Sequence, residues 1–239
     1  MEELRRPRWP AQIGAMTHAP GTSPGPIELA RELWRRLPRD LPFLTRARLT
    51  MRPVTTPFGD VLSWIPERAS ITDIGCGRGT LLGLALLLRS PVSLAGLEID
   101  PKLVEYSRAM LDHLGAGRLA NVSVYDGRTI DERVTGADCV VLLDVLHHVP
   151  PPSQRGLLLD IFTAMRPGAR FILKDIDGGS PLVIFNRVHD LVFSREVVHE
   201  LAMSDTASYL QEIGFVIENI RCRRVVWYPH YTLVCGKPQ

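Results

Sequence analysis

Short apolar runs alternate with longer amphipathic segments over most of the chain. Five of these runs are predicted to be strands, and each is followed by a segment whose apolar residues recur at helical spacing. The runs end at Asp73, Ile99, Tyr125, Asp144 and Lys174. Strands that alternate with helices in this order predict an α/β fold with a parallel sheet and helices on both of its faces.

Helices are expected between these strands, before the first strand and after the fifth. Asp100 and Pro101 supply an N-cap and a first-turn proline for one helix, and Gly115 ends it. Two further helices are expected to begin with the cap residues Ser153 and Ser204. The other predicted helices span 27–37, 58–65 and 181–193, and one begins at Thr80. Two late strands, 215–222 and 231–235, follow the last helix.

The composition is that of an ordinary globular protein. The chain has 239 residues, of which 45% are hydrophobic and 23% charged, and its formal net charge is +2. This charge indicates neither nucleic acid nor an acidic partner. The longest aliphatic stretch, 81–88, is too short to span a bilayer, and we expect no secretory signal at the N-terminus. The cysteines are expected to be buried thiols of a cytoplasmic protein, because they lack metal spacing: Cys76, Cys139, Cys222 and Cys235.

Three glycines at alternate positions, Gly75, Gly77 and Gly79, connect the first strand to a leucine-rich helix. Glycine lets the backbone turn sharply and approach a ligand closely, and the N-terminus of the following helix favours an anionic group. The dinucleotide fingerprint would require a third glycine at Thr80, and the lysine of a P-loop is absent. A tight turn without a ligand is the competing interpretation.

The stretch Asp73-x-Gly75-Cys76-Gly77-x-Gly79 resembles the first motif of class I S-adenosylmethionine-dependent methyltransferases of the small-molecule type. In that family an acid at the end of the second strand binds the ribose, and Gly96-Leu97-Glu98-Ile99 is similar to that motif. The resemblance covers roughly 57–236. It implies a Rossmann-like, doubly wound sheet of seven strands with the last strand antiparallel. It also implies S-adenosyl-L-methionine as cofactor and S-adenosyl-L-homocysteine as product.

The same resemblance assigns further residues to the cofactor. Asp126, with Gly127 after it, matches an acid that meets the adenine amino group, although Asp-Gly is also common in plain turns. Asp144 ends the fourth strand and Val145 follows it, and this strand lies beside the first in this fold. The implied cofactor contacts are Asp73, Gly75, Cys76, Gly77, Gly79, Glu98, Ile99, Asp126, Gly127, Asp144 and Val145.

Two adjacent histidines, His147 and His148, follow the fourth strand. A hydroxyl acceptor must lose a proton during methyl transfer, and histidine is well matched to take it near neutral pH. Asp175, or else Asp177, is expected to orient one of the histidines. The competing interpretation is that they only cap backbone or face the core. His189 and Asp190 form a second candidate pair.

Other methyltransferase subclasses fit the sequence less well. DVLH at 144–147 lacks the element found in enzymes that methylate adenine amino groups, and KDID at 174–177 lacks the asparagine of metal-dependent catechol methyltransferases. We therefore expect no metal and a small-molecule acceptor, with a hydroxyl favoured and carbon or nitrogen left open. The alternative is a non-catalytic relative that binds the cofactor or serves as a partner subunit.

Two regions are expected to shape the acceptor pocket: an N-terminal flexible and helical lid at 1–56, and a lid insertion at 178–203 within the methyltransferase domain, 57–239. Aromatic residues in them indicate either an apolar or aromatic acceptor or plain packing of the lid: Trp34, Phe43, Phe185 and Phe193. Seven arginines between 31 and 52 indicate either a solvated surface or an anion-attracting rim over the site. A homodimer is left open.

Overall fold

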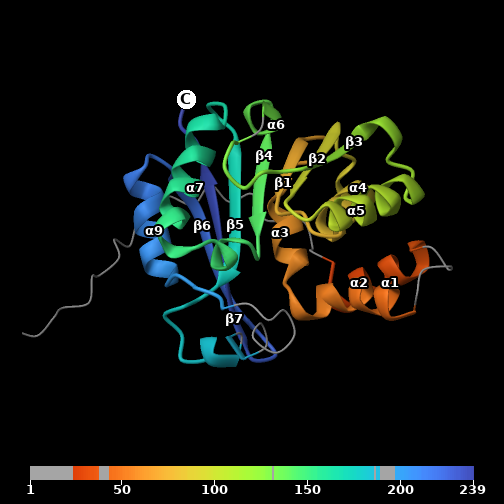
Figure 1. Cartoon of the computed structure of the whole chain (residues 1–239), viewed down its shortest axis with the longest axis horizontal. Helices are drawn as coiled ribbons and strands as arrows, with labels where there is room; N and C mark the ends of the chain where they lie inside the picture. Colours follow the sequence, from red (N-terminus) through yellow and green to blue (C-terminus); the bar gives the residue numbers. More distant parts are fainter. Residues whose placement is uncertain (1–23, 38–42, 131, 186, 189–196) are drawn as a thin grey trace, which may run out of the picture.

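A seven-stranded sheet in the order β3-β2-β1-β4-β5-β7-β6 runs through the computed structural model (Figure 1), which describes residues 24–37, 43–130, 132–185, 187–188 and 197–239. Its parallel strands are β1 (Ser70–Ile74), β2 (Ser93–Glu98), β3 (Ala120–Val124), β4 (Cys139–Leu143) and β5 (Arg170–Ile176). β7 (Tyr228–Gly236) is antiparallel to β5 and to β6 (Val216–Val225). The predicted doubly wound sheet with an antiparallel last strand is confirmed.

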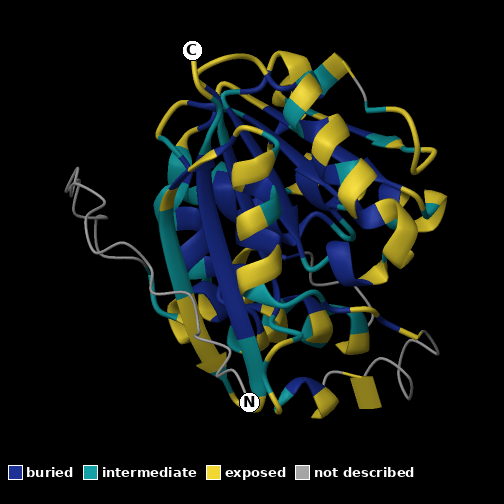
Figure 2. Ribbon diagram, turned by 90° about the vertical axis from the view of Figure 1, so that its left-hand side faces the viewer, coloured by how far each residue is buried: buried dark blue, intermediate teal, exposed yellow. Residues whose placement is uncertain are grey.

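Helices cover both faces of the sheet, and the buried strands lie between them (Figure 2). One apolar core joins the sheet to α1 (Pro26–Arg36), α2 (Phe43–Thr55), α3 (Phe58–Trp64), α4 (Thr80–Arg89) and α5 (Pro101–His113). A second core on the opposite face joins it to α6 (Glu132–Thr135), α7 (Pro151–Ala164) and α9 (Met203–Glu212). Single 3-10 turns are η1 (Gly117–Leu119) and η2 (Leu146–His148). The apolar runs have this cause, since the central parallel strands such as β4 are buried on both faces, whereas the edge strand β3 is partly exposed.

Two predicted helix starts are wrong, each for a local reason. α7 begins at Pro151 rather than at Ser153, because prolines are already set for the first turn of a helix and need no N–H there. α9 begins at Met203 rather than after Ser204. The carboxylate of Asp177 accepts the N–H of Met203 at 3.0 Å, so a residue distant in the chain takes the place of the expected serine cap. The N-cap at Asp100 is confirmed by its bond to the N–H of Lys102.

Three further expectations concern α2, Cys222 and the segment 181–193. α2 was not predicted from the pattern, and it contains Pro53. Cys222 is exposed, contrary to the expectation for all four cysteines, because it lies on the edge strand β6, whereas the other three cysteines are buried. The predicted helix at 181–193 falls partly outside the described residues, and so do His189, Asp190 and Phe193.

The junction between α2 and α3 is fastened to the antiparallel end of the sheet by polar contacts. Asp60 of α3 is buried, and its carboxylate oxygens lie 2.8 Å from Arg221 and 3.2 Å from Arg223 on β6. The carbonyl of Thr55, the last residue of α2, accepts a hydrogen bond from His230 Nε2 at 3.0 Å. These contacts position the N-terminal helices over the carboxyl edge of the parallel strands.

Replacing Asp60 by asparagine should lower the free energy of unfolding by about 1–3 kcal/mol, because a buried carboxylate that pairs with two half-exposed arginines loses its charge. Urea denaturation measures the change. The exposed Asp112 of α5 is the matched control, and Asp112→Asn should change stability by less than about 0.5 kcal/mol. Equal effects of the two substitutions would contradict the role given to Asp60.

Candidate functional site

The loop between β1 and α4 has three glycines in the left-handed region, with φ of +73° at Gly75, +55° at Gly77 and +76° at Gly79. A Cβ at Gly75 would overlap the side chain of Val145, and one at Gly79 would overlap Ser107. A Cβ at Gly77 would meet no atom of the protein within 4 Å. Gly75 and Gly79 are therefore required for packing, while Gly77 leaves its backbone open to a ligand.

Glu98, the last residue of β2, ties this loop to the neighbouring strand. Its carboxylate accepts the N–H of Gly77 at 2.8 Å on Oε2, and the N–H groups of Ile99 and Asp100 at 2.8 and 3.1 Å on Oε1. A carboxylate offers about four acceptor positions, so one position remains on Oε2. The sequence motif alone does not show that most of this carboxylate is already engaged by the protein.

Asp73 lies beside Glu98 and is fully buried in β1. Its Oδ1 has no hydrogen-bond partner among the described residues. Burial, together with the nearby charge of Glu98, raises the pKa of Asp73 to about 8, against the opposing effect of Arg52. A buried carboxyl group without a partner is costly unless a polar or cationic group meets it, so this side chain indicates a missing ligand.

The other residues expected around the base and ribose are close together but differ in role. Ile99 is exposed, and a Cβ at Gly127 would lie 3.9 Å from it. Asp126 is exposed and accepts the N–H groups of Arg128 and Thr129, both at 2.8 Å, which lower its pKa. The Asp-Gly turn is therefore present, and the adenine contact of Asp126 stays a prediction.

Cys76 faces away from the open side of the loop. A Cβ at Gly96 would lie 2.8 Å from its thiol, so the thiol packs against β2. Burial raises its pKa far above the ordinary value. Its side chain is therefore part of the core, and only its backbone could contact a ligand.

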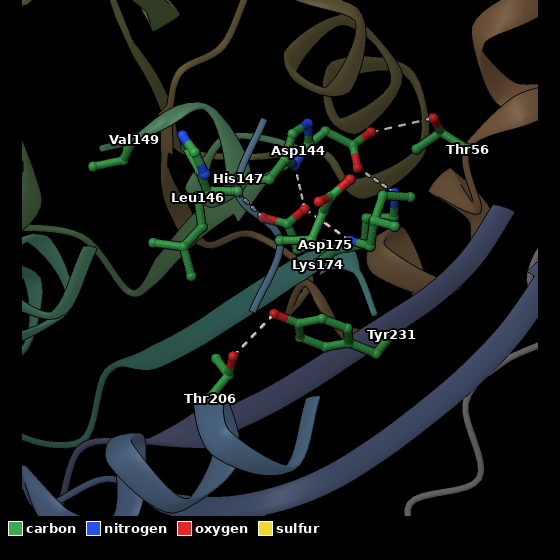
Figure 3. Close-up of polar contacts among 12 residues, drawn as sticks. Thr56, Asp144, Leu146, His147, Val149, Lys174, Asp175, Thr206 and Tyr231 are labelled. Atoms are coloured by element: carbon green, nitrogen blue, oxygen red, sulfur yellow. Dashed lines mark hydrogen bonds and ion pairs between the residues drawn. The ribbon is translucent and has the colours of Figure 1, made fainter. Parts of the chain in front are cut away.

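Asp144 follows β4 with φ of +54° and is bound from two directions (Figure 3). The ammonium group of Lys174, which is fully buried, contacts Oδ1. The hydroxyl of Thr56 lies 3.3 Å and the guanidinium of Arg52 lies 3.5 Å from Oδ2. Burial alone would raise the pKa of Asp144, but Lys174 and Arg52 hold it well below its ordinary value. The side chain is therefore ionised at neutral pH.

His147 and Asp175 are brought together on the other side of the same strand ends (Figure 3). Nδ1 of His147 donates to Oδ1 of Asp175, whose oxygens also accept the N–H of Ile176 at 2.7 Å and that of His147 at 3.2 Å. His147 is buried and His148 is exposed, with ring centroids 4.1 Å apart. Asp177 is not part of this pair, because it binds the N–H groups of Gly179 and Met203.

Three residues of the site, Lys174, Gln154 and His230, were not predicted from the sequence, and Arg52 was one of seven arginines for which an anion-attracting rim was one of two interpretations. Lys174 and Arg52 belong to the Asp144 cluster. Gln154 of α7 donates its buried amide to the carbonyls of Leu146 at 3.0 Å and of His199 at 2.7 Å, which fixes the turn that carries His147. His230 is buried, and burial together with Lys174 lowers its pKa to about 3. Lys174 and His230 could have been recognised as candidate site residues, because each is a polar residue within a largely apolar strand.

No group of three or more His, Cys, Asp and Glu in the described ranges is arranged to hold a metal ion. The absence of a metal cofactor stays a prediction. In the same part of the chain, every helix is too short or too polar to cross a bilayer.

Comparison with known proteins agrees with this geometry. Residues 72–171 match the model of a methyltransferase domain. The carboxy-S-adenosyl-L-methionine synthase of Campylobacter fetus subsp. fetus is 26% identical over 111 residues, which are 46% of this chain and 46% of that protein. The chain thus spans about half the length of the curated relatives it first matches.

Solved structures share the fold. Magnesium protoporphyrin IX methyltransferase from Synechocystis PCC 6803, solved with bound S-adenosylhomocysteine, has a TM-score of 0.63 and 18% identity, covering 88% of this chain and 95% of that one. A Haloferax volcanii protein described as a putative methyltransferase, in complex with the Trm112 activator, has a TM-score of 0.65 and 13% identity, covering 81% and 94%. At this identity the likeness concerns the fold.

The domain match over 72–171, the motif and the sheet order together support a methyltransferase domain of class I, which depends on S-adenosyl-L-methionine. S-adenosyl-L-methionine is accordingly the cofactor of this domain. The residues present fit it: Gly77 leaves room at the backbone, Glu98 keeps one acceptor position for a hydroxyl, and the unpartnered Asp73 suits a cationic group.

Replacing Gly77 by alanine should weaken S-adenosylhomocysteine binding at least tenfold, because the new Cβ enters the space left for the ligand. Calorimetric titration measures the dissociation constant. Gly115 is the matched control, since it has φ of +83° and also has no atom near its Cβ position. Both substitutions carry about 1–2 kcal/mol of backbone strain, but Gly115→Ala should keep the affinity. Equal affinities for the two variants would contradict the placement.

His230 should make the protein less stable in acid. The unfolded chain takes up a proton at the ordinary pKa of histidine, about 6.5, whereas folded His230 does so only near 3, so stability falls as the pH drops from about 6.5 towards 3. Between pH 7 and pH 5 the wild type should lose about 2 kcal/mol more than His230→Gln, measured by urea denaturation at each pH. Parallel losses in the two proteins would exclude this role.

Proposed function

We propose that this protein transfers the methyl group of S-adenosyl-L-methionine to a small-molecule acceptor, with a hydroxyl group favoured and carbon or nitrogen left open. One observation carries the proposal: Nδ1 of the buried His147 donates to Asp175 at the carboxyl edge of β4 and β5, beside the cofactor residues. Bound S-adenosyl-L-methionine supplies an already activated methyl group. The chain then has to orient the acceptor and remove one proton.

His147 suits the removal of that proton. Because Nδ1–H donates to a carboxylate, Nε2 is the nitrogen that carries the lone pair of the neutral ring. Asp175 stabilises the imidazolium that forms when Nε2 takes a proton, and two backbone N–H groups hold this carboxylate in place. His148 is exposed, so we assign the base to His147 and leave to His148 a contact with the acceptor.

The proposal requires no metal ion. The acids after β4 and at the end of β5 are already engaged, Asp144 by Lys174 and Asp175 by His147, while Asp177 binds two backbone N–H groups. A divalent cation would need several free carboxylates at one point. A base and a positioned acceptor are sufficient for the transfer.

The regions 1–56 and 178–203 are proposed to shape the acceptor pocket over the domain at 57–239. The ring of Trp34 lies 6.4 Å from that of Phe43, and Phe185 lies 6.0 Å from Trp227 on the hairpin of β6 and β7. These aromatic groups favour an apolar or aromatic acceptor. A cytoplasmic location and a homodimer are predictions that accompany this proposal.

Substituting His147 by alanine should lower turnover by about 10²–10⁴-fold, the range for loss of a general base, while S-adenosylhomocysteine affinity changes little. His148→Ala should have a smaller effect, and His113→Ala, at the exposed end of α5, none. Formation of S-adenosylhomocysteine with a panel of phenols, acids and amines measures turnover. Asp175→Asn should lower turnover and shift the pH profile, since it no longer stabilises the imidazolium. Full activity of His147→Ala would remove it from the mechanism.

Assays on the same purified protein distinguish methyl transfer from two other functions. The name of the curated relatives indicates synthesis of a carboxylated S-adenosylmethionine, and mass spectrometry of the cofactor would reveal this product in place of the demethylated one. A non-catalytic protein would bind S-adenosylmethionine and convert it with no member of the panel. Either result would replace methyl transfer as the function.

A further inference from the structure

The arginines of the N-terminal helices do not form one uniform surface. Arg36 pairs with Glu32 at 3.0 Å within α1. Arg46 of α2 lies over the ring of Trp34, with its guanidinium carbon 4.0 Å from the ring centroid. Arg52, near the end of α2, reaches the carboxyl edge of the sheet and approaches Asp144. Arg52 therefore differs from Arg36 and Arg46, which contact residues of the N-terminal helices, because it reaches the sheet.

The contact between Arg52 and Asp144 is weak. The two groups are 3.5 Å apart and the Arg52 side chain is 48% exposed, and such pairs contribute little to stability. It is the one hydrogen bond that the guanidinium makes with described residues, although a guanidinium has five N–H donors. Asp144 does not depend on it, because the buried Lys174 and the hydroxyl of Thr56 already bind this carboxylate.

The guanidinium also lies where two strand ends meet. It acts electrostatically on two carboxyl groups: it opposes the rise in the pKa of Asp73 in β1, and it helps Lys174 to lower the pKa of Asp144 after β4. These strands are neighbours in the sheet, and α2 lies at their carboxyl edge (Figure 1). A cation with unused donors thus stands near Asp144 and near the unpartnered oxygen of Asp73.

We propose that Arg52 is a carboxylate-binding residue, whose guanidinium leaves Asp144 and binds the carboxylate of a small molecule at this edge. The planar guanidinium matches a carboxylate in a two-point geometry. The exchange leaves no unpaired charge behind, since Lys174 stays on Asp144. The inference rests on the proposed function, which brings two small molecules here, so the carboxylate belongs either to the methionine part of the cofactor or to the acceptor.

Binding of S-adenosylhomocysteine and of its decarboxylated analogue, which keeps the adenosine, the thioether and the amine, tests the first source. Wild type, Arg52→Gln and Arg52→Lys are titrated by calorimetry, with Arg48→Gln as the control, since Arg48 is an exposed arginine one turn earlier on α2. If the cofactor supplies the carboxylate, Arg52→Gln weakens S-adenosylhomocysteine binding about tenfold and leaves the analogue unchanged. Arg52→Lys should recover part of the loss.

The second source is tested on protein saturated with S-adenosylhomocysteine, to which para-hydroxybenzoate and para-hydroxybenzamide are added as probes. If the acceptor supplies the carboxylate, wild type prefers the acid and Arg52→Gln loses that preference. Arg52→Gln without a selective effect on either carboxylate overturns the inference while leaving methyl transfer intact. A wild type that does not bind S-adenosylhomocysteine refutes the proposed function itself, and the inference with it.

Discussion

The carboxylate of Glu98 joins the ends of two neighbouring strands, and the cofactor edge depends on this junction. By accepting N–H groups from Gly77, Ile99 and Asp100, it holds the glycine loop of β1 against the turn after β2. Hydrogen bonds to an ionised acceptor are among the stronger ones in proteins. The loop is thereby fixed in its left-handed conformation before a ligand arrives, so binding does not have to order it.

At the carboxyl ends of β4 and β5, the site is built by two adjacent residues of β5 whose side chains point to opposite faces of the sheet. Lys174 faces the N-terminal helices and binds Asp144, whereas Asp175 faces α7 and binds His147. One strand end therefore serves two purposes: a charge cluster under α2, and an oriented histidine beneath the region after β5. Gln154 adds a third connection, from α7 to the turn that carries His147 and to His199.

The fold could be predicted from the sequence because the central parallel strands are apolar, as 139–143 illustrates, and because helices such as 26–36 bury residues at helical spacing. The glycine loop and Glu98 were predicted because their spacing follows from strand and helix lengths. The contacts of Arg52, Gln154 and His230 could not be, because they join elements far apart in the chain: Thr55 and His230 are 175 positions apart. The choice of Asp175 over Asp177 for His147 likewise depends on Asp177 capping α9.

Hydrogen exchange measured by mass spectrometry, with and without S-adenosylhomocysteine, tests most directly whether the cofactor lies on this edge. The backbone at the strand ends should gain protection in four places, 73–79, 98–100, 125–128 and 144–147, and the hairpin of β6 and β7 should not change. Absence of any protection, or protection centred on the opposite edge of the sheet near Arg68 and Arg166, would contradict this placement.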